Sequence, residues 1–447
     1  MSRYIVNGGK TLNGEISIRG AKNASFKQII ASMLSGKPTL LTNVPKISDV
    51  NITTSIAAKL GAQVNHTGEH SLEISTPTVD SYIVPKGTGQ KSRTSFMFAA
   101  PLLARCGQAI VPFPGGDRLG DRPLDRLFDC LHQMNISINI ENDLVHFQTD
   151  AIKPTHYTFL KPSHTVTETI LMLACVANGE TVLENSALEP EIDDLIDMLN
   201  SMGGQIERDK NDPKKIIIQG VPWLNGTKHQ VISDRNESVT FACAALATKG
   251  SINILRINPA IIQTFLETIQ KMGAKIDTGK DEVTVSWVQP LKAINIETTP
   301  EPGFMTDWQA VFSVLLTQAI GCSTIIERIF PSRFQHISYL KQMGVKTSFF
   351  NPANIDSDYY FFNPESDKPE YFHGVKIYGP AKLQPGNLVV SDLRAGASVT
   401  LAALIAPGQT VIDGVEYIER GYEKLAERLN SLGAGIEYIK KSLVRPV

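Results

Sequence analysis

The sequence predicts an α/β protein of two domains in which apolar helices lie inside and β-sheets lie outside. Three observations support this class: the length, an internal repeat, and the unusual apolarity of one set of helices. At 447 residues the chain is too long for a single ordinary core, so two large domains are expected. Six copies of one repeated unit then favour three units in each domain.

Each repeat opens with a glycine turn followed by a short strand rich in β-branched residues. The six turns lie at Gly36, Gly107, Gly179, Gly250, Gly321 and Gly408. A helix and a second strand follow each of them, and the helix ends in an apolar residue and a turn. These endings are Leu60-Gly61-Ala62, Met134-Asn135-Ile136, Met202-Gly203-Gly204, Met272-Gly273-Ala274, Met343-Gly344-Val345 and Leu432-Gly433-Ala434. Glycine, or asparagine in the second copy, tolerates the left-handed conformation that ends a helix.

Another helix, apolar on nearly every side, precedes each glycine turn. These helices are expected at Phe26–Leu34, Arg93–Ala104, Thr167–Ala177, Glu237–Thr248, Asp307–Ala319 and Ala395–Ala406. A helix that is apolar all round must be buried, which places the sheets outside. The N-terminal ends of the buried helices in one domain then point the same way, and their dipoles converge on an anion site.

The repeats also divide the chain. One domain is expected at residues 22–230, with a mobile loop at residues 112–126, and the other combines residues 1–21 with residues 231–447. The stretch Gln219–Asp234 is the expected crossing point between them.

Composition and charge exclude several classes of protein. The net charge of -2 gives no electrostatic reason to bind nucleic acid or an anionic membrane. Apolar runs are too short to span a bilayer, and the first twenty residues lack the apolar region of a signal peptide. The five cysteines are widely spaced, as expected for free thiols in a reducing compartment. We therefore expect a cytoplasmic protein, a monomer or a weak oligomer, without metal or cofactor.

Polar and charged clusters stand at the starts of the six apolar helices. Serine, threonine, aspartate and asparagine there are explained as ordinary N-caps. Capping does not explain Lys22, Arg93 or Arg394, because a cation at a helix N-terminus opposes the helix dipole. Arg333 and Arg420 lie elsewhere in their repeats. Together these cations suit a substrate that carries phosphate and carboxylate groups.

The stretch Pro112–Arg126 is a surface loop by composition, because it is rich in turn residues and charges. Asp117 stands near its tip, beside Arg118 and close to Arg122. An acid among guanidinium groups suits proton transfer to an anionic substrate. Taken alone, the stretch is better explained as a solvated loop, and the rest of the chain changes that balance.

Nucleotide and metal motifs are weak or missing. Gly8-Gly9-Lys10-Thr11 resembles the end of a P-loop, but Tyr4 occupies the place of the first glycine. The dinucleotide-binding pattern G-x-G-x-x-G does not follow any strand, and the spacing of His and Cys does not suit a metal site.

Motifs spread over nearly the whole length give the chain a resemblance to the enolpyruvyl transferases. Each motif is weak alone, and their order along the chain makes the resemblance specific. They are Gly20-Ala21-Lys22-Asn23-Ala24, Asn43-Val44-Pro45-Lys46, Pro114-Gly115-Gly116, Gly120-Asp121-Arg122-Pro123, Glu189-Pro190-Glu191-Ile192, Thr306-Asp307, Arg333-Phe334, Asp392-Leu393-Arg394-Ala395 and Arg420-Gly421-Tyr422.

The resemblance implies a two-domain inside-out α/β barrel made of two enolpyruvyl transferase domains. It implies transfer of the enolpyruvyl group of phosphoenolpyruvate to the 3-hydroxyl of UDP-N-acetylglucosamine, in the first committed step of peptidoglycan precursor synthesis. The reaction passes through a tetrahedral adduct and needs no metal. Phosphate is released, and phosphoenolpyruvate and the sugar nucleotide are the only partners implied.

Roles for individual residues follow from the resemblance alone. Asp307 resembles the base that takes the proton of the hydroxyl, and Asn23 a contact to the acceptor sugar. The cations that resemble phosphoenolpyruvate ligands are Lys22, Arg122, Arg394 and Arg420, with Arg93 and Arg333 nearby. Lys22 is also expected to act in catalysis. Further substrate contacts are implied at Pro123, Leu124, Asp125, Lys161, Ser163 and Ile329.

The chain departs from the family pattern at several places. Asp117 stands where the family often has a cysteine, which is the general acid and the thiol alkylated by fosfomycin. Aspartate occurs there in some members, so we expect an active enzyme that resists the drug. Ser163-His164-Thr165-Val166-Thr167 replaces S-V-G-A-T in a loop that contacts the uridine diphosphate. Met97 replaces an aromatic residue, and the segment 349–372 is atypical and has no interpretation from sequence.

Other functions remain open at this point. The altered loop at Ser163 leaves room for an enolpyruvyl transferase that uses another nucleotide or nucleoside. A 5-enolpyruvylshikimate-3-phosphate synthase is disfavoured by the P-G-G-D loop and by Glu189-Pro190-Glu191. A non-catalytic paralogue that binds sugar nucleotide is a third reading, but it has no need for both Asp117 and Asp307.

Overall fold

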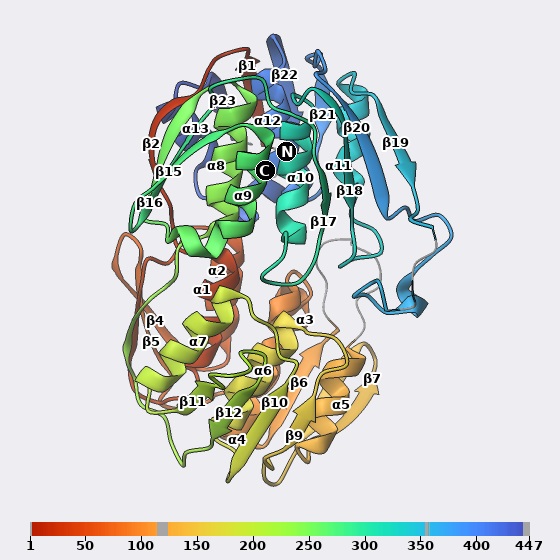
Figure 1. The fold of residues 1–447 in the computed structure, drawn as a ribbon. Helices are drawn as coiled ribbons and strands as arrows, with labels where there is room; N and C mark the ends of the chain where they lie inside the picture. The colour runs from red at the N-terminus through yellow and green to blue at the C-terminus, as the bar shows by residue number, and fades with distance from the viewer. Residues whose placement is uncertain (1, 114–123, 354–355, 357, 441–447) are drawn as a thin grey trace. The chain divides into compact units, whose positions relative to one another are not determined.

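A computed structural model describes residues 2–113, 124–353, 356 and 358–440 of the chain (Figure 1). The described residues form two compact units. We call residues 2–19 with 233–440 the C-terminal unit, and residues 20–113 with 124–232 the N-terminal unit. The chain passes from one unit to the other between Ile232 and Ser233, within the crossing point expected from the sequence.

The C-terminal unit packs its sheets around three helices that contact one another: α8 (Arg235–Ala247), α10 (Gln309–Leu316) and α12 (Leu393–Ile405) (Figure 1). Every residue of α8 is buried, as expected for a helix without a polar face. The helices α9 (Gln263–Met272), α11 (Gln335–Gln342) and α13 (Leu425–Ser431) have exposed polar sides, and so cover the unit from outside.

Within the described residues the C-terminal unit has three sheets, with strand orders β21-β22-β1-β23, β15-β16-β14-β2 and β17-β18-β20-β19. Their strands are β1 (Arg3–Gly8), β2 (Asn13–Ser17), β14 (Ser251–Leu255), β15 (Lys275–Thr278), β16 (Glu282–Ser286), β17 (Asn295–Glu297), β18 (Gly321–Ile326), β19 (Thr347–Phe350), β20 (Gly374–Gly379), β21 (Asn387–Val389), β22 (Gly408–Asp413) and β23 (Ile436–Ile439).

The N-terminal unit repeats this plan with α1 (Lys22–Ser32), α4 (Ala99–Cys106) and α6 (His164–Ala174) as its apolar helices. Four more helices belong to it: α2 (Ser48–Lys59), α3 (Lys86–Gly89), α5 (Asp125–Gln133) and α7 (Pro190–Ser201). Its sheets, again counted over the described residues, have the orders β13-β3-β5-β4, β6-β8-β7 and β11-β12-β10-β9.

The strands of the N-terminal unit follow the same repeat. They are β3 (Thr39–Thr42), β4 (Gln63–Gly68), β5 (Ser71–Ser75), β6 (Gln108–Pro112), β7 (Ser137–Glu141), β8 (Leu144–Gln148), β9 (His156–Thr158), β10 (Glu180–Glu184), β11 (Gln205–Arg208), β12 (Ile216–Gln219) and β13 (Lys228–Gln230).

One pairing pattern recurs in the sheets and confirms the predicted repeat. Within the described residues, the strand after each glycine turn pairs antiparallel with one neighbouring strand and, in five of the six copies, in parallel with another. In one copy, Ile254 of β14 lies opposite Ile16 of β2 and Val283 of β16. The second copy replaces the parallel strand with a single bridge between Ile83 and Ile110. The fold is therefore α/β with helices inside and sheets outside, as predicted.

The glycine turns that end the outer helices also agree with the sequence. Gly61, Gly203, Gly273, Gly344 and Gly433 all have positive φ, and Asn135 takes the same conformation in the second copy with φ 64°. Residues other than glycine and asparagine rarely adopt this conformation, which explains the restricted choice at these six positions.

The buried helices begin earlier than the sequence predicts. Helix α1 starts at Lys22 and not at Phe26, and α6 starts at His164 and not at Thr167. Two others begin with a 3-10 turn, η1 (Arg93–Phe98) before α4 and η3 (Thr306–Trp308) before α10. The polar clusters therefore supply both caps and first turns: Ser92, Asp234 and Asp392 cap η1, α8 and α12 with their side chains, as predicted. In α1 and α6 the cluster residues Lys22 and His164 lie in the first turn itself.

None of the helices in the described part of the chain is both long and apolar enough to cross a bilayer. The five cysteines are free, and three of them, Cys130, Cys175 and Cys243, are buried.

Candidate active site

A carboxylate held between two guanidinium groups forms the centre of the candidate site in the C-terminal unit. Asp307 lies in the 3-10 turn that opens α10. Its Oδ1 accepts from Nη2 of Arg333, and its Oδ2 accepts from Nη2 of Arg394 at 2.9 Å. Arg333 and Arg394 are largely buried, so these charge-assisted contacts are strong ones. Sequence reasoning named all three residues, and the structure brings them into direct contact.

A buried hydroxyl chain fixes Arg394 from the other side. Nη1 of Arg394 donates to the Tyr422 hydroxyl at 3.2 Å. Thr240 of α8 donates its one hydrogen to the carbonyl of Asn236, so the Tyr422 hydroxyl donates to Thr240 Oγ1 at 2.8 Å. Burial is the largest single influence and lowers the pKa of Arg394. The charges of Asp307, Tyr422 and Asp234 and the hydrogen bond to Asp307 together outweigh burial, so the pKa is raised overall. The guanidinium is therefore permanently charged.

The starts of the three buried helices of the C-terminal unit meet at this cluster. Asp234 caps α8 by accepting from the amides of Asn236 and Glu237, at 2.7 and 3.1 Å. Its charge also acts on Arg394, which is the second residue of α12. Asp307 stands at the start of α10. The convergence of helix starts expected from the sequence is therefore present in this unit, together with the cations.

The segment after β18 carries two predicted contacts, Ile329 and Arg333, and a buried carboxylate organises it. Glu327 Oε1 accepts from the amides of Ile329 and Phe330, at 2.9 and 3.1 Å. Its Oε2 accepts from Thr306 Oγ1 at 2.8 Å. Burial raises the pKa of Glu327, against the charge of Arg333 and these hydrogen bonds. Glu327 thus ties the segment to the residue that precedes Asp307.

A second buried chain supports Arg333. Gln309 Nε2 donates to the carbonyl of Arg333 at 3.0 Å, and Ser313 Oγ donates to the carbonyl of Gln309 at 2.7 Å. Because Ser313 has spent its hydrogen, Nε2–H of His336 must donate to Ser313 Oγ, at 3.0 Å. Burial and then the charge of Arg333 lower the pKa of His336 to about 3. His336 is therefore a neutral link between α10 and α11.

Arg420 lies at the end of the 3-10 turn η5 (Val415–Arg420), which packs against α12. It precedes Tyr422, the partner of Arg394, by two residues. The structure thus places Arg420 close in sequence to the same cluster, and gives it a half-buried side chain.

The N-terminal unit holds its own set of predicted residues at helix starts. Lys22 is the first residue of α1, and its Nζ lies 2.8 Å from Oδ2 of Asp49 on α2. Asn23 follows it in the same turn. Arg93 opens η1, which contacts α1, and burial lowers the pKa of its guanidinium. Arg93 and Lys22 are therefore the first residues of two helical segments that contact each other.

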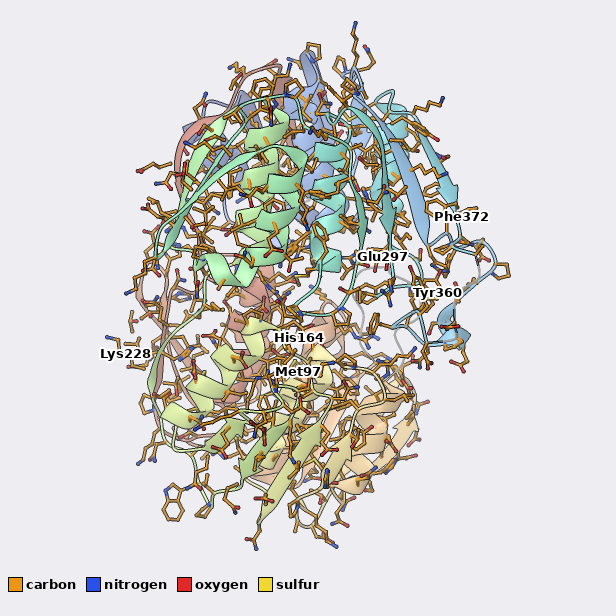
Figure 2. The ribbon with its side chains drawn as sticks, in the orientation of Figure 1. Met97, His164, Lys228, Glu297, Tyr360 and Phe372 are labelled. Carbon is orange, nitrogen blue, oxygen red and sulfur yellow. The ribbon has the colours of Figure 1, made fainter. Side chains whose placement is uncertain are left out.

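The altered loop at Ser163 proves to hold a buried charge cluster. His164 is the first residue of α6, and its Nε2 lies 2.9 Å from Lys27 Nζ of α1 and 3.1 Å from Glu168 Oε1 (Figure 2). Lys27 Nζ lies 2.6 Å from Glu168 Oε2. Burial lowers the pKa of His164, but Glu168 and Glu189 outweigh burial and Lys27, so the pKa is raised overall.

The remaining predicted contacts are placed only in part. Ser163 and Lys161 lie just before α6, and Leu124 and Asp125 lie at the start of α5. Asp117, Arg122 and Pro123 lie outside the described residues, as does most of the loop predicted at residues 112–126. Met97, where the family often has an aromatic residue, is buried in the core of the N-terminal unit (Figure 2).

Sequence reasoning missed the partners that hold these residues. Tyr422 could have been predicted, because it is the last residue of the motif Arg420-Gly421-Tyr422. Glu327 and His336 gave no signal, because a single acid or histidine in an apolar stretch has many explanations. Lys27 and Glu168 are a clearer miss. Two opposite charges in two helices that were expected to be apolar indicate a buried pair.

Known proteins with similar sequences cover nearly the whole chain. The sequence model of one family, described as EPSP synthase (3-phosphoshikimate 1-carboxyvinyltransferase), matches residues 6–429. A UDP-N-acetylglucosamine 1-carboxyvinyltransferase of Halorhodospira halophila is 34% identical over 98% of this chain and 100% of its own length. A protein of the same name from Photobacterium profundum is 36% identical, over 99% of this chain and 100% of its own.

Solved structures agree on the fold. The enolpyruvyl transferase NikO from Streptomyces tendae has a TM-score of 0.84 at 22% identity, with 98% of this chain and 99% of that chain covered. EPSP synthase from Acinetobacter baumannii has a TM-score of 0.71 at 19% identity, with 98% and 100% covered. At these identities the likeness establishes the architecture alone.

Proposed function

Because the chain belongs to the EPSP synthase family of enolpyruvyl transferases, we propose that it transfers the enolpyruvyl group of phosphoenolpyruvate to the 3-hydroxyl of UDP-N-acetylglucosamine. Phosphate is the second product. The reaction is the first committed step of peptidoglycan precursor synthesis. The acceptor is assigned from relatives of that name that align over their full length.

The observation that carries the proposal is the position of Asp307 between Arg333 and Arg394. A carboxylate is a competent base for a sugar hydroxyl, and a general base of this kind accelerates a reaction by about 10²–10⁴-fold. The two guanidinium groups offer the planar, charged donors that phosphate and carboxylate groups bind best. Base and anion site thus share one cluster.

This sharing couples substrate binding to the chemistry. Each oxygen of Asp307 accepts from an arginine, so the two guanidinium groups compete with a sugar hydroxyl for the carboxylate. An anionic substrate competes for Arg333 and Arg394 and draws them away from the carboxylate. We infer that phosphoenolpyruvate itself releases the base, which limits proton abstraction to the loaded enzyme.

The proposed reaction needs one carboxyl group that donates a proton and one carboxylate that accepts a proton. Asp117 gives a proton to C3 of phosphoenolpyruvate, and the sugar hydroxyl attacks C2 while Asp307 takes the hydroxyl proton. In the elimination, phosphate leaves with the proton held by Asp307, and Asp117 takes back a proton from C3, which leaves the enolpyruvyl ether and restores both carboxyl groups. Lys22, Arg122 and Arg420 balance the anionic charge with Arg394. Lys22 and Asn23, which share a helix turn, contact the reacting groups and the acceptor.

The other assigned contacts complete the proposal. Arg93, Pro123, Leu124, Asp125, Lys161, Ser163, Arg333 and Ile329 are assigned to substrate binding on the family motifs. The free cysteines and the near-neutral charge support a cytoplasmic location, without nucleic acid or membrane as partners. We propose a monomer or a weak oligomer.

Release of phosphate from phosphoenolpyruvate by the purified protein tests the reaction. Turnover that requires UDP-N-acetylglucosamine, with formation of its enolpyruvyl ether, supports the proposal. Asp307→Asn should largely abolish this turnover. Asp277→Asn is its matched control, because Asp277 pairs only with the exposed Lys275 in the described contacts. Phosphate release without formation of the ether would contradict the assignment of the acceptor.

A second acceptor is favoured by one observation, the charged cluster around His164. A bulky imidazole at the start of α6, with its pKa raised by Glu168 and Glu189 against burial and Lys27, alters the loop that the resemblance assigns to the uridine diphosphate. Turnover with another nucleotide or nucleoside, but not with UDP-N-acetylglucosamine, would support enolpyruvyl transfer to that other acceptor. Sugar-nucleotide binding without turnover on any acceptor would instead favour a non-catalytic paralogue.

A further inference from the structure

The atypical segment of the C-terminal unit makes direct contact with the segment that carries Ile329 and Arg333. Residues 358–373, which we call the clamp, lie between β19 and β20. The amide of Phe361 donates to the carbonyl of Arg328 at 2.8 Å, and the amide of Glu327 donates to the carbonyl of His373 at 2.8 Å. The clamp therefore forms backbone hydrogen bonds with Glu327 and Arg328, the two residues that immediately precede the 329–333 segment.

Arg328 is the side chain that the clamp holds. Its Nε donates to the carbonyl of Tyr359 at 2.9 Å, and its Nη1 donates to Glu297 Oε2 at 3.0 Å. The guanidinium carbon lies 4.1 Å from the centre of the Tyr359 ring and 5.2 Å from that of Phe361. A planar cation that lies close to two rings and donates two hydrogen bonds is fixed in orientation as well as in position.

The clamp has a small core of its own. The rings of Tyr360 and Phe362 are stacked with centres 4.8 Å apart, and the His373 ring lies 4.7 Å from Tyr360. His373 Nε2 lies 3.1 Å from Asp367 Oδ2, which closes the segment on itself. Figure 2 shows Tyr360 on this segment, with Glu297 at the end of β17 nearby. The clamp can therefore act as a rigid support.

The contacts continue from Arg328 to the candidate base. Glu327 is buried, and its carboxylate accepts from the amides of Ile329 and Phe330 and from the hydroxyl of Thr306. Thr306 precedes Asp307, and Arg333 at the far end of the segment pairs with Asp307. The clamp thus holds one end of the segment, and the carboxylate of Asp307 holds the other.

We propose that the clamp makes Arg328 a positioning residue, which sets the 329–333 segment in its binding conformation before substrate arrives. The proposal rests on the proposed function, which assigns Ile329 and Arg333 to substrate binding. A segment ordered in advance costs less to bind and orients reacting groups better. The role of the aromatic residues of the clamp is then to fix the guanidinium of Arg328.

Two variants of the full-length protein remove the support without entering the substrate segment. Tyr359→Leu removes a ring beside Arg328, and Arg328→Lys keeps the charge but loses the planar fork. Tyr359→Phe keeps the ring beside Arg328 and loses only the hydroxyl that is hydrogen-bonded to Glu297, so it should behave much more like wild type than Tyr359→Leu. Tyr371→Leu is the matched control, because it removes a ring of the same segment that lies over Lys368 and not over Arg328.

The first measurement is hydrogen exchange at the amides of Ile329 and Phe330, which needs no reaction. Exchange should become about fivefold to tenfold faster in Tyr359→Leu, as expected from the loss of one cation–π contact. It should also become faster in Arg328→Lys, which loses the hydrogen bonds of the planar fork, and stay unchanged in Tyr371→Leu. Unchanged exchange in both clamp variants, in protein with native circular dichroism, would overturn the proposal. If neither variant folds, Tyr359→Met provides the same comparison with a flexible side chain that fills the space.

The second measurement is the steady-state rate. KM for phosphoenolpyruvate should rise about fivefold to tenfold in Tyr359→Leu with a smaller change in kcat, and should stay close to the wild-type value in Tyr359→Phe. Faster exchange with an unchanged KM would also overturn the proposal, because the segment would then be mobile without effect on substrate. A wild-type protein without turnover would contradict the proposed function instead, and the exchange experiment would still decide whether the clamp orders the segment.

Discussion

At the scale of single residues, the charged groups of the candidate site are paired within their own unit. Asp49 neutralises Lys22, and Asp307 engages both Arg333 and Arg394. A buried charge without a partner is expensive, so the loss of either member of a pair would leave the other charge uncompensated. A substrate anion must therefore compete with an internal carboxylate, and the strength of the pairs sets part of the binding free energy.

Replacing Asp307 with asparagine tests its role as the base. Asp307→Asn keeps the size of the side chain but cannot take a proton at neutral pH, so kcat should fall about 10²–10⁴-fold. Binding of phosphoenolpyruvate should remain measurable by calorimetry, because Arg333 and Arg394 lose a competing carboxylate. Asp277→Asn, on an exposed strand, should leave both quantities unchanged. A near-normal kcat in Asp307→Asn would show that another group is the base.

His164 provides a second test, by proton NMR titration of its ring. Glu168 raises the pKa of His164 and Lys27 lowers it. Glu168→Gln should therefore lower the pKa of His164, and Lys27→Gln should raise it. Shifts of the same sign in the two variants would contradict the cluster, and circular dichroism establishes that both variants fold. The result decides whether the loop presents a cation to the acceptor at neutral pH.

At the scale of helices and strands, turn chemistry could be predicted and helix starts could not. The residues that end the outer helices are glycine or asparagine because the backbone there is left-handed, and that requirement is visible in the sequence. The first turns of α1 and α6 consist of polar residues that also suit caps and loops. Only tertiary contacts, such as those of Lys22 with Asp49, select the helix.

The link between α10 and α11 makes stability depend on pH. His336 is neutral when folded, with its pKa lowered to about 3, whereas the ordinary value is 6.5. Between these values the unfolded chain binds more protons, so the free energy of unfolding falls as the pH falls. The slope from this one group is at most about 1.4 kcal/mol per pH unit.

Urea unfolding at several pH values measures this slope. His336→Gln removes the titrating group, so the stability difference between wild type and variant should shrink as the pH is lowered from 6.5 towards 4. His66→Gln, at an exposed strand position, should follow the wild type throughout. A constant difference between wild type and His336→Gln would show that His336 is not held neutral by the fold.

At the scale of the whole molecule, most of the fold that could be predicted from the sequence follows from the repeat. Six glycine turns and six apolar helices determine the number and kind of layers, because apolar area must be buried somewhere. They do not determine which acidic side chain pairs with which basic one. The partnership of Asp307 with Arg394, 87 residues away, depends on helix starts that converge only in the folded unit. The atypical segment at 349–372 lacks the repeat pattern, and only its contacts with Arg328 give it an interpretation.

The loop residue Asp117 lies outside the described residues and gives the last prediction, which concerns the response of the whole enzyme to fosfomycin. A carboxylate is a far poorer nucleophile than a thiolate towards this drug, so turnover should persist when fosfomycin is present. Asp117→Cys restores a thiol at the same position, and should give an enzyme that is active, inactivated by the drug and labelled once, as measured by mass spectrometry. Cys106→Ser and Cys322→Ser in the same background control for labelling of the two native thiols that are not buried, of which Cys322 is exposed. Inactivation of the wild-type enzyme with a covalent adduct at Asp117 would contradict the prediction. A separate variant, Asp117→Asn, tests the chemical role: loss of turnover without change in substrate binding would assign proton donation to this carboxyl.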